Sequence, residues 1–281
     1  MFMLESEEYK GKGINLANGL LVNWITLVFH GQDSMFLKAV FRALVYKCSH
    51  GHKCKKGEKW MPPHYLVSAV QGGETHDVKT SFGTYQVRMG LVGMAEEFHK
   101  RLLKATEHGV DSCMHGILSQ KFYNNVLNLG KGWYVPLVSP IGYSPKELTT
   151  WENKIRDKHH AGERKEVSDI LFDTKGNEIR EDIFKVDKKV FSYIIKGPSA
   201  GNEQPWRFYV DGDTYHLCVE LSGKEIYRKN HLNEMDAGIA MATFSMLAKE
   251  YSLGGEWTVQ KNPKIYRKNS EIYIASYIIP S

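Results

Sequence analysis

Apolar residues recur along this chain with two kinds of spacing, one typical of helices and one typical of strands. Apolar positions three and four residues apart predict amphipathic helices over residues 36–45, 85–107 and 235–251. Short apolar runs that follow polar or proline-containing stretches predict buried strands over 65–70 and 133–138. The chain therefore contains both classes of element.

Other segments are less regular. Residues 14–29 are apolar without a clean period and are interpreted as a helix followed by a strand, and the polar, glycine-rich residues 71–83 as a loop. Apolar strands on either side of Asp211-Gly212-Asp213 predict a β-hairpin over 208–220. A charged run at 145–166 precedes a short apolar element at 167–172. We therefore expect a first half at 1–150, a charged linker at 151–172 and a second half at 173–281.

The two halves share their spacing. Pro62, with the strand after it, lies 143 residues before Pro205 and its strand. The helix end at Val110 lies the same distance before the helix end at Leu253. This spacing predicts an internal duplication, in which two pseudo-symmetric halves meet at a crevice.

Composition limits the classes of function. A chain of 281 residues with 42% hydrophobic and 25% charged residues is typical of a soluble globular protein with a sizeable core. The net charge of +5 is mild and scattered, which disfavours nucleic-acid and membrane binding but suits a small phosphate-bearing ligand. The most apolar run, 20–29, is too short to span a membrane. Four cysteines and the absence of a signal-like N-terminus indicate a reducing, cytoplasmic setting.

One segment carries residue types that bind metals. Residues 48–54 have the sequence Cys-Ser-His-Gly-His-Lys-Cys, with two thiols and two imidazoles. Their alternating spacing differs from the separated Cys-x-x-Cys knuckles of tetrahedral zinc sites. A solvated basic loop is therefore the favoured interpretation, and no metal ligand is assigned.

The most distinctive stretch is residues 196–208, Lys-Gly-Pro-Ser-Ala-Gly-Asn-Glu-Gln-Pro-Trp-Arg-Phe. Its prolines restrict φ and its glycines permit unusual backbone angles. Ser199, Asn202 and Gln204 offer neutral hydrogen-bonding groups that suit a flat heterocycle. The same composition is also typical of an ordinary turn before a strand, so this stretch alone leaves both interpretations open.

Residues 197–208 resemble the Ala-Pro-Ser-x-x-Asn-x-Gln-Pro-Trp-x-Phe motif of the FMN-dependent nitroreductase superfamily. The helix at 236–241 and the turn at 253–257 are similar to the long core helix and the Gly-Leu-Gly turn of that fold. The resemblance covers residues 60–281 and implies an α+β fold with mixed sheets flanked by helices. Together with the repeated spacing, it points to a branch in which two nitroreductase-like halves are fused in one chain, so that a monomer could hold the whole site.

The resemblance also implies a cofactor and an activity. FMN would take electrons from NAD(P)H and pass them to a nitroaromatic, a quinone or a similar small acceptor. This chemistry depends on stacking and donor distance, so no catalytic acid or base is assigned. The implied FMN contacts are the loop residues, the residues facing the N5 side of the ring and a basic pair at the phosphate. They are Pro198, Ser199, Ala200, Asn202 and Gln204; Met114, His115 and Gly116; and Arg164 and Lys165.

The chain departs from the family pattern at two places. Family members begin with Arg-x-Ser-x-Arg before an aromatic residue, whereas residues 4–8 here are Leu-Glu-Ser-Glu-Glu, and carboxylates there would repel a phosphate. Residues 113–116 are Cys-Met-His-Gly in place of the usual Cys-Trp-x-Gly-Gly. Two functions therefore stand as hypotheses: an FMN-dependent oxidoreductase, and a non-catalytic flavin- or ligand-binding protein on the same fold.

Overall fold

The structure, a computed structural model, describes residues 9–12, 23–30, 64–71, 75–116, 130–143, 150–179, 186 and 188–280. The chain divides into two compact units. The first unit contains the described residues of 1–13, 22–72 and 101–144, and the second contains those of 73–100 and 145–281. This division differs from the expected halves, because residues 73–100 belong to the same unit as the C-terminal part of the chain.

The strands of the first unit form an antiparallel sheet in the order β1-β2-β3-β9-β6, with β8 paired to β3 and β7 to β9. The apolar run of β3 is buried, and Ser68 within it is satisfied by β9. Its hydroxyl donates to the Leu137 carbonyl at 3.0 Å and accepts from the Leu137 amide at 3.2 Å. The bounds are β1 Tyr9–Lys12, β2 Asn23–His30, β3 His64–Gln71, β6 Asp111–Ser112, β7 His115–Gly116, β8 Trp133–Tyr134 and β9 Leu137–Gly142.

The second unit contains a five-stranded sheet in the order β10-β11-β12-β14-β13. β10 is parallel to β11, and the other neighbours are antiparallel. The two edge strands have three residues each, and Phe172 of β10 also forms an isolated bridge with Glu178. The bounds are β10 Leu171–Asp173, β11 Trp206–Asp211, β12 Thr214–Glu220, β13 Glu256–Thr258 and β14 Glu271–Ile278; a separate hairpin consists of β4 Thr75–Thr80 and β5 Gly83–Arg88.

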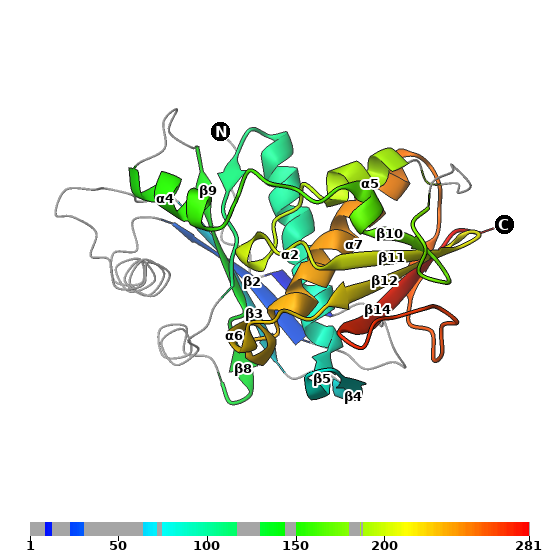
Figure 1. Ribbon diagram of the computed structural model, residues 1–281. Helices are drawn as coiled ribbons and strands as arrows, with labels where there is room; N and C mark the ends of the chain where they lie inside the picture. The colour runs from blue at the N-terminus through cyan, green and yellow to red at the C-terminus, as the bar shows by residue number, and fades with distance from the viewer. Residues whose placement is uncertain are drawn as a thin grey trace. The chain divides into compact units, whose positions relative to one another are not determined.

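Helix α7 forms the centre of the second unit and packs against β11, β12 and α5 (Figure 1). Its residues are apolar around most of its circumference, as expected of a buried helix. The ring of Phe244 lies 5.7 Å from that of Phe208 on β11 and 6.0 Å from that of Phe191 on α5. The helices are α2 Met89–Glu107, α4 Thr150–Lys158, α5 Lys188–Ile194, α6 Glu225–Lys229 and α7 Leu232–Glu250, with 3-10 turns at η1 Val167–Asp169 and η2 Ala200–Asn202.

Helices α2 and α7 approach closely at Gly238. A methyl group on Gly238 would lie 2.3 Å from the carbonyl oxygen of Val92 and 2.7 Å from the amide nitrogen of Glu96. These distances are well inside ordinary contact, so the crossing depends on a residue without a side chain.

Several predicted elements are confirmed. The strand predicted at 65–70 is β3, the hairpin predicted at 208–220 is β11 and β12, and the strand within 14–29 is β2. The strand predicted at 133–138 is present as β8 and β9, with a break at residues 135–136. The helix predicted at 36–45 lies outside the described residues.

The prediction of a loop at 71–83 was wrong. Residues 75–88 form the β4–β5 hairpin, whose turn is closed by the Thr80 hydroxyl, which accepts from the Phe82 amide and donates to the Gly83 carbonyl. Most of this ribbon is exposed, so its strands lack the apolar alternation that marks a half-buried strand. The helix predicted from residue 85 begins four residues later, at Met89. Residues 85–88 belong instead to β5, with Tyr85 and Val87 on its buried face.

Two other boundaries differ from the predictions. Helix α7 begins at Leu232, so Asp236 lies inside the helix and not at its start. The segment 151–172, expected as a linker, contains most of α4 together with η1 and the start of β10, and it belongs to the second unit. Some of its charges are carried on this short helix, and the others, including Arg164 and Lys165, follow it.

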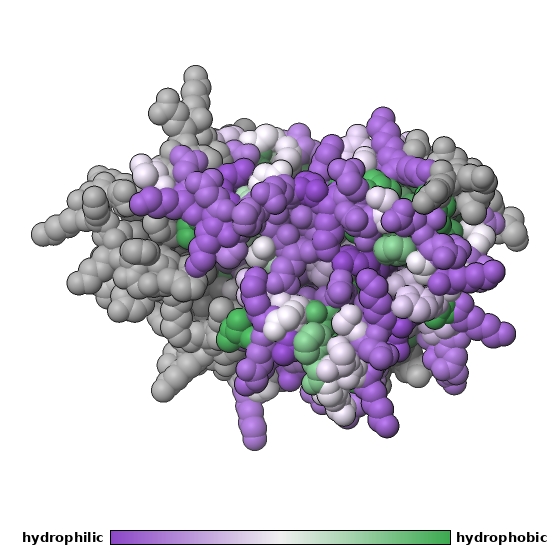
Figure 2. Space-filling view, in the orientation of Figure 1, coloured by the Kyte–Doolittle hydropathy of each residue, from purple (hydrophilic) through white to green (hydrophobic). Residues whose placement is uncertain are grey.

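The described part of the chain has a mainly hydrophilic surface in the view of Figure 2, with small, separate apolar spots. Among the described residues, no helix is both long enough and apolar enough to cross a membrane.

Candidate functional site

The loop between α5 and β11 has a backbone that few residue types adopt. Gly201, Asn202 and Gln204 all have positive φ angles, of 58°, 58° and 48°. A methyl group on Gly201 would also lie 2.6 Å from the hydroxyl oxygen of Tyr227. The backbone angle therefore favours glycine at position 201, and a side chain there would also have to displace the Tyr227 hydroxyl.

Asp236 anchors this loop from inside α7. Its Oδ1 accepts a hydrogen bond from the Ala200 amide at 3.0 Å, and its backbone oxygen accepts one from Nε1 of Trp206 at 2.6 Å. The side chain is buried, Oδ2 has no hydrogen-bond partner among the described residues, and burial raises the pKa of this carboxyl group. Asp236 was not predicted as a site residue from the sequence. The signal that could have found it is an acidic residue between the apolar Met235 and Ala237.

The two amide side chains of the loop bind the segment that follows α4. Nδ2 of Asn202 donates to the carbonyl oxygens of His160 and Glu163, at 2.7 and 3.0 Å. Oδ1 of Asn202 accepts from the Arg164 guanidinium at 2.6 Å. Both ends of this amide are therefore used within the protein.

Gln204 continues the same contact. Its Oε1 accepts from the Lys165 amide at 2.9 Å, and its backbone oxygen accepts from Nζ of Lys165 at 3.0 Å. Ser199 supports it, because the Ser199 hydroxyl accepts from the Gln204 amide at 2.9 Å. The structure thus brings the predicted loop residues and the predicted basic pair together, although about forty residues separate them along the chain.

The basic pair carries positive charge that Glu220, Asp169 and Glu203 offset at Lys165 without forming an ion pair with it. None of the ion pairs formed among the described residues includes Arg164 or Lys165. Two of these acids are engaged in ion pairs elsewhere, since Glu203 pairs with Lys224 at 2.9 Å and Glu220 with Arg207 at 2.5 Å. Burial, together with the neighbouring Arg207 guanidinium, lowers the pKa of Lys165 to about 8.

This arrangement fits an anion. A guanidinium and an ammonium on consecutive residues suit a phosphate, one as a fork and the other as a point charge, and a bound anion would offset the repulsion between Lys165 and Arg207. In the loop that holds this pair, Pro198 is exposed, and Ser199 and Ala200 are half-buried. The residues present therefore fit the phosphate end of FMN, whereas the amide of Asn202 has no donor left for the ring.

The remaining predicted residues, Met114, His115 and Gly116, belong to the first unit, where His115 and Gly116 form β7 and pair with β9. Nε2 of His115 is buried without a hydrogen-bond partner among the described residues. Burial lowers the pKa of His115 to about 4, so its imidazole is neutral at physiological pH.

Two sequence features lie outside the described residues: the Cys-His segment at 48–54 and the glutamates at 5, 7 and 8. Within the described ranges, no group of three or more His, Cys, Asp or Glu side chains is arranged to hold a metal ion.

Comparison with known proteins identifies a family. The family model described as "Putative TM nitroreductase" matches residues 64–248, which is more than half of the chain. A structure search finds the crystal structure of a putative nitroreductase from Thermotoga maritima, at 18% identity and a TM-score of 0.44, covering 80% of this chain and 73% of the other. A search of curated proteins found no match.

Proposed function

Because the chain belongs to the nitroreductase family whose model spans residues 64–248, we propose that it is an FMN-dependent oxidoreductase that passes electrons from NAD(P)H to a small acceptor. The acceptor would be a nitroaromatic, a quinone or a similar compound. The observation that supports this proposal most directly is the pair Arg164 and Lys165, which forms no ion pair among the described residues and is held against a loop with the family motif.

Each part of the loop has a role in this proposal. Arg164 and Lys165 bind the FMN phosphate, and Pro198, Ser199 and Ala200 lie against the flavin. Asn202 and Gln204 act as positioning residues, because their side chains hold the backbone on which the two cations sit. FMN, when bound, supplies the redox chemistry, accepting a hydride and passing electrons on.

The proposal predicts how FMN affinity depends on pH. The free protein carries the Lys165 ammonium below about pH 8 and loses it as the pH rises through that value. FMN affinity should therefore fall between pH 8 and 9, by up to about tenfold per unit for one linked proton. Lys165→Arg keeps its charge throughout this range and should abolish the fall. A wild-type affinity that is constant from pH 7 to 9 would contradict a phosphate contact by Lys165.

Binding measurements test the same site by substitution. Removing the charge in Lys165→Met should weaken FMN binding about tenfold or more, the usual effect of losing one charged hydrogen bond. Lys196→Met is the matched control, because Lys196 is an exposed lysine on the same loop that lies over the Tyr193 ring. Asn202→Ala should also weaken binding, through the released 160–165 segment. Equal affinities for the Lys165 and Lys196 variants would sink the phosphate assignment.

The absorption spectrum separates the proposed enzyme from the second candidate function. A yellow protein that NAD(P)H bleaches, and that recovers colour when a quinone is added, supports the oxidoreductase. A non-catalytic flavin- or small-ligand-binding protein that has lost tight FMN binding is favoured by one observation, the glutamates at 5, 7 and 8 in place of the family arginines. Such a protein would be colourless after purification, or would not bleach with NAD(P)H when FMN is added. The fused duplication, and with it activity as a monomer, stays a prediction.

A further inference from the structure

The loop between α5 and β11 rests on α7 at three points. Asp236 of α7 accepts a hydrogen bond from the Ala200 amide at 3.0 Å, and its backbone oxygen accepts one from Nε1 of Trp206 at 2.6 Å. One turn further along α7, the Ile239 side chain packs at Gly197, where an added methyl group would lie 3.5 Å from it. Helix α7 therefore supports the start, the middle and the end of the loop.

Hydrogen bonds within the loop carry this support from Ala200 toward Gln204. The Ser199 carbonyl oxygen accepts from the Asn202 amide at 3.0 Å, and the Ser199 hydroxyl accepts from the Gln204 amide at 2.9 Å. The Ala200 carbonyl oxygen accepts from the Glu203 amide at 3.2 Å. Asn202 and Gln204 both have positive φ angles, which residues with a side chain rarely adopt, so these bonds hold a backbone that would otherwise relax.

The last link joins the loop to the basic pair. Oδ1 of Asn202 accepts from the Arg164 guanidinium, and Oε1 of Gln204 accepts from the Lys165 amide. No ion pair among the described residues joins Asp236 to another part of the chain. The route from α7 to the two cations therefore runs through the loop, along a chain of hydrogen bonds that begins at Asp236 and ends at the Lys165 amide.

The loop has a second support on its exposed side. Glu203 accepts from the Ser222 hydroxyl at 3.0 Å and pairs with Nζ of Lys224 at 2.9 Å. The Lys224 side chain is 53% exposed, so solvent screens this ion pair and makes it weak. Asp236 is only 3% exposed, and burial strengthens its hydrogen bond to the loop. The support from α7 is therefore the stronger of the two.

Asp236 acts on the loop as a neutral acceptor. Burial, together with the carboxylates of Glu203 and Glu234, raises the pKa of Asp236 and favours its protonated form. The carbonyl oxygen of an asparagine side chain offers the Ala200 amide the same kind of acceptor, whereas alanine offers none. Asparagine should therefore replace Asp236 in this role and alanine should not.

We propose that Asp236 is a positioning residue for FMN binding, which acts from inside α7 on the phosphate contacts of Arg164 and Lys165. By holding Ala200, it keeps Asn202 and Gln204 where they bind the 160–165 segment. This inference rests on the proposed flavin function, but the chain of contacts itself is open to a measurement that needs no flavin.

Hydrogen exchange of the Lys165 amide in the free protein reads this chain at its far end, because that amide donates to Gln204. Asp236→Ala should raise the exchange rate at least about tenfold, and Asp236→Asn should leave it within about twofold of wild type. FMN affinity should follow the same order, with a loss of about tenfold or more in Asp236→Ala and little change in Asp236→Asn.

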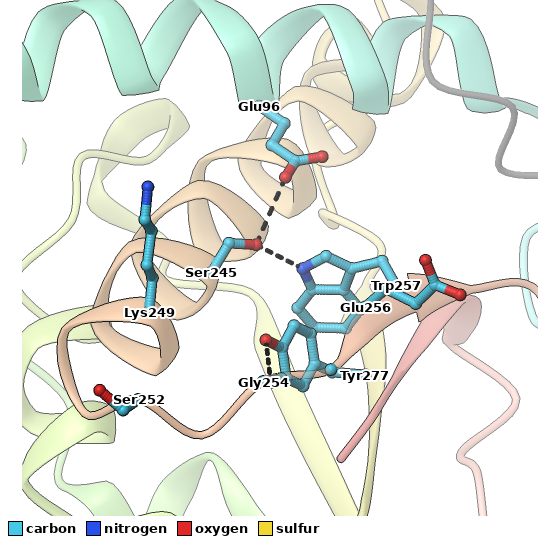
Figure 3. Close-up of a pocket in the computed structure, with 9 residues that line it drawn as sticks. Glu96, Ser245, Lys249, Ser252, Gly254, Glu256, Trp257 and Tyr277 are labelled. Atoms are coloured by element: carbon cyan, nitrogen blue, oxygen red, sulfur yellow. Dashed lines mark hydrogen bonds between the residues drawn. The ribbon is translucent and has the colours of Figure 1, made fainter. Parts of the chain in front are cut away.

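Ser245→Ala is the matched control on the same helix. Ser245 lines a cavity of about 530 Å³ at the C-terminal end of α7, and none of the residues that line this cavity belongs to the loop (Figure 3). Its hydroxyl accepts from Nε1 of Trp257 at 2.8 Å and donates to Oε1 of Glu96 at 3.4 Å. This variant also removes hydrogen bonds made by α7, but it should change neither the exchange of the Lys165 amide nor the affinity for FMN.

Ser199→Ala interrupts the chain in its middle and keeps the test decisive if Asp236→Ala does not fold. Ser199 is half-buried on the loop, and its hydroxyl holds the Gln204 amide, so this variant should also accelerate exchange of the Lys165 amide.

Three results would overturn the proposal. The first is a Lys165 amide that keeps its wild-type exchange rate in Asp236→Ala or in Ser199→Ala. The second is equal acceleration in Ser245→Ala or in Asp236→Asn, and the third is wild-type FMN affinity in Asp236→Ala. An accelerated amide in a protein that binds no FMN at all would instead overturn the flavin site and support the link from Asp236 to Lys165.

Discussion

Gly238→Ala tests the close crossing of α2 and α7, because the crossing decides whether this substitution raises or lowers the free energy of unfolding. Alanine is the better helix former and alone would raise the free energy of unfolding by about 1 kcal/mol. The added methyl group would instead lie 2.3 Å from the Val92 carbonyl oxygen, 2.7 Å from the Glu96 amide nitrogen and 2.8 Å from Cβ of Ala95. None of these atoms can rotate away, so the helices would have to separate by about 1 Å to restore normal contact.

The net effect should be destabilising. Forcing an extra methyl group into a packed contact costs about 1–3 kcal/mol beyond any gain in helix propensity, so we expect the free energy of unfolding to fall by about 2 kcal/mol. Urea unfolding at 25 °C, followed by circular dichroism, measures this change. The comparison requires that the free energy of unfolding depends equally steeply on urea concentration in the variant and in wild type.

Gly93→Ala is the control for the substitution itself. Gly93 lies in α2 and is buried like Gly238, and within the described part of the chain no neighbouring atom lies within 4 Å of the position of an added methyl group. It should therefore gain helix propensity without a clash and become more stable by about 0.5–1 kcal/mol. The reasoning is refuted if Gly238→Ala is as stable as wild type, or if both variants change stability in the same direction.

Two further predictions concern buried polar groups. Tyr85 donates to Oε2 of Glu234 at 2.7 Å, so Tyr85→Phe should leave that buried oxygen without a donor. The free energy of unfolding should fall by about 1–3 kcal/mol. A change below about 0.5 kcal/mol, measured by urea unfolding, would contradict this. Burial lowers the pKa of His99 to about 4 from its usual 6.5, so the unfolded state binds a proton first as the pH falls. Wild type should therefore lose about 3 kcal/mol between pH 6.5 and 4 from this group, with no further loss from it below pH 4, and His99→Leu should lack that loss. Parallel stability curves for the two proteins would exclude the assignment.

Local patterns were sufficient for part of the fold. The β3 strand and the β11–β12 hairpin were predicted because their apolar runs and turn residues lie within a few positions of each other. The β4–β5 hairpin was missed because most of it is solvated, and α5 and β14 were not predicted at all. In β14, Glu271, Tyr273 and Ser276 interrupt the apolar run. Glu271 accepts from Tyr209 of β11, Ser276 bonds to His216 of β12, and Tyr273 accepts from the Gln260 amide, so each has a partner outside β14 that the local sequence does not indicate.

The candidate site shows the same limit. The loop and the basic pair could be selected from sequence through a family resemblance, but their direct contact depends on the fold. That contact also changes the role proposed for Asn202, from a ligand contact to a support for Arg164 and Lys165. Asp236 was not selected, because an unpaired oxygen on a buried acid is a property of packing and leaves no pattern in the sequence.

The three-residue edges of the five-stranded sheet have a consequence for self-association. A sheet grows by accepting another strand along an edge whose amides and carbonyls are unpaired. Here β10 and β13 each offer only three residues, and β10 is also bridged by the chain's own Glu178. This sheet therefore gives an incoming strand little backbone to pair with, which protects the second unit against edge-to-edge aggregation.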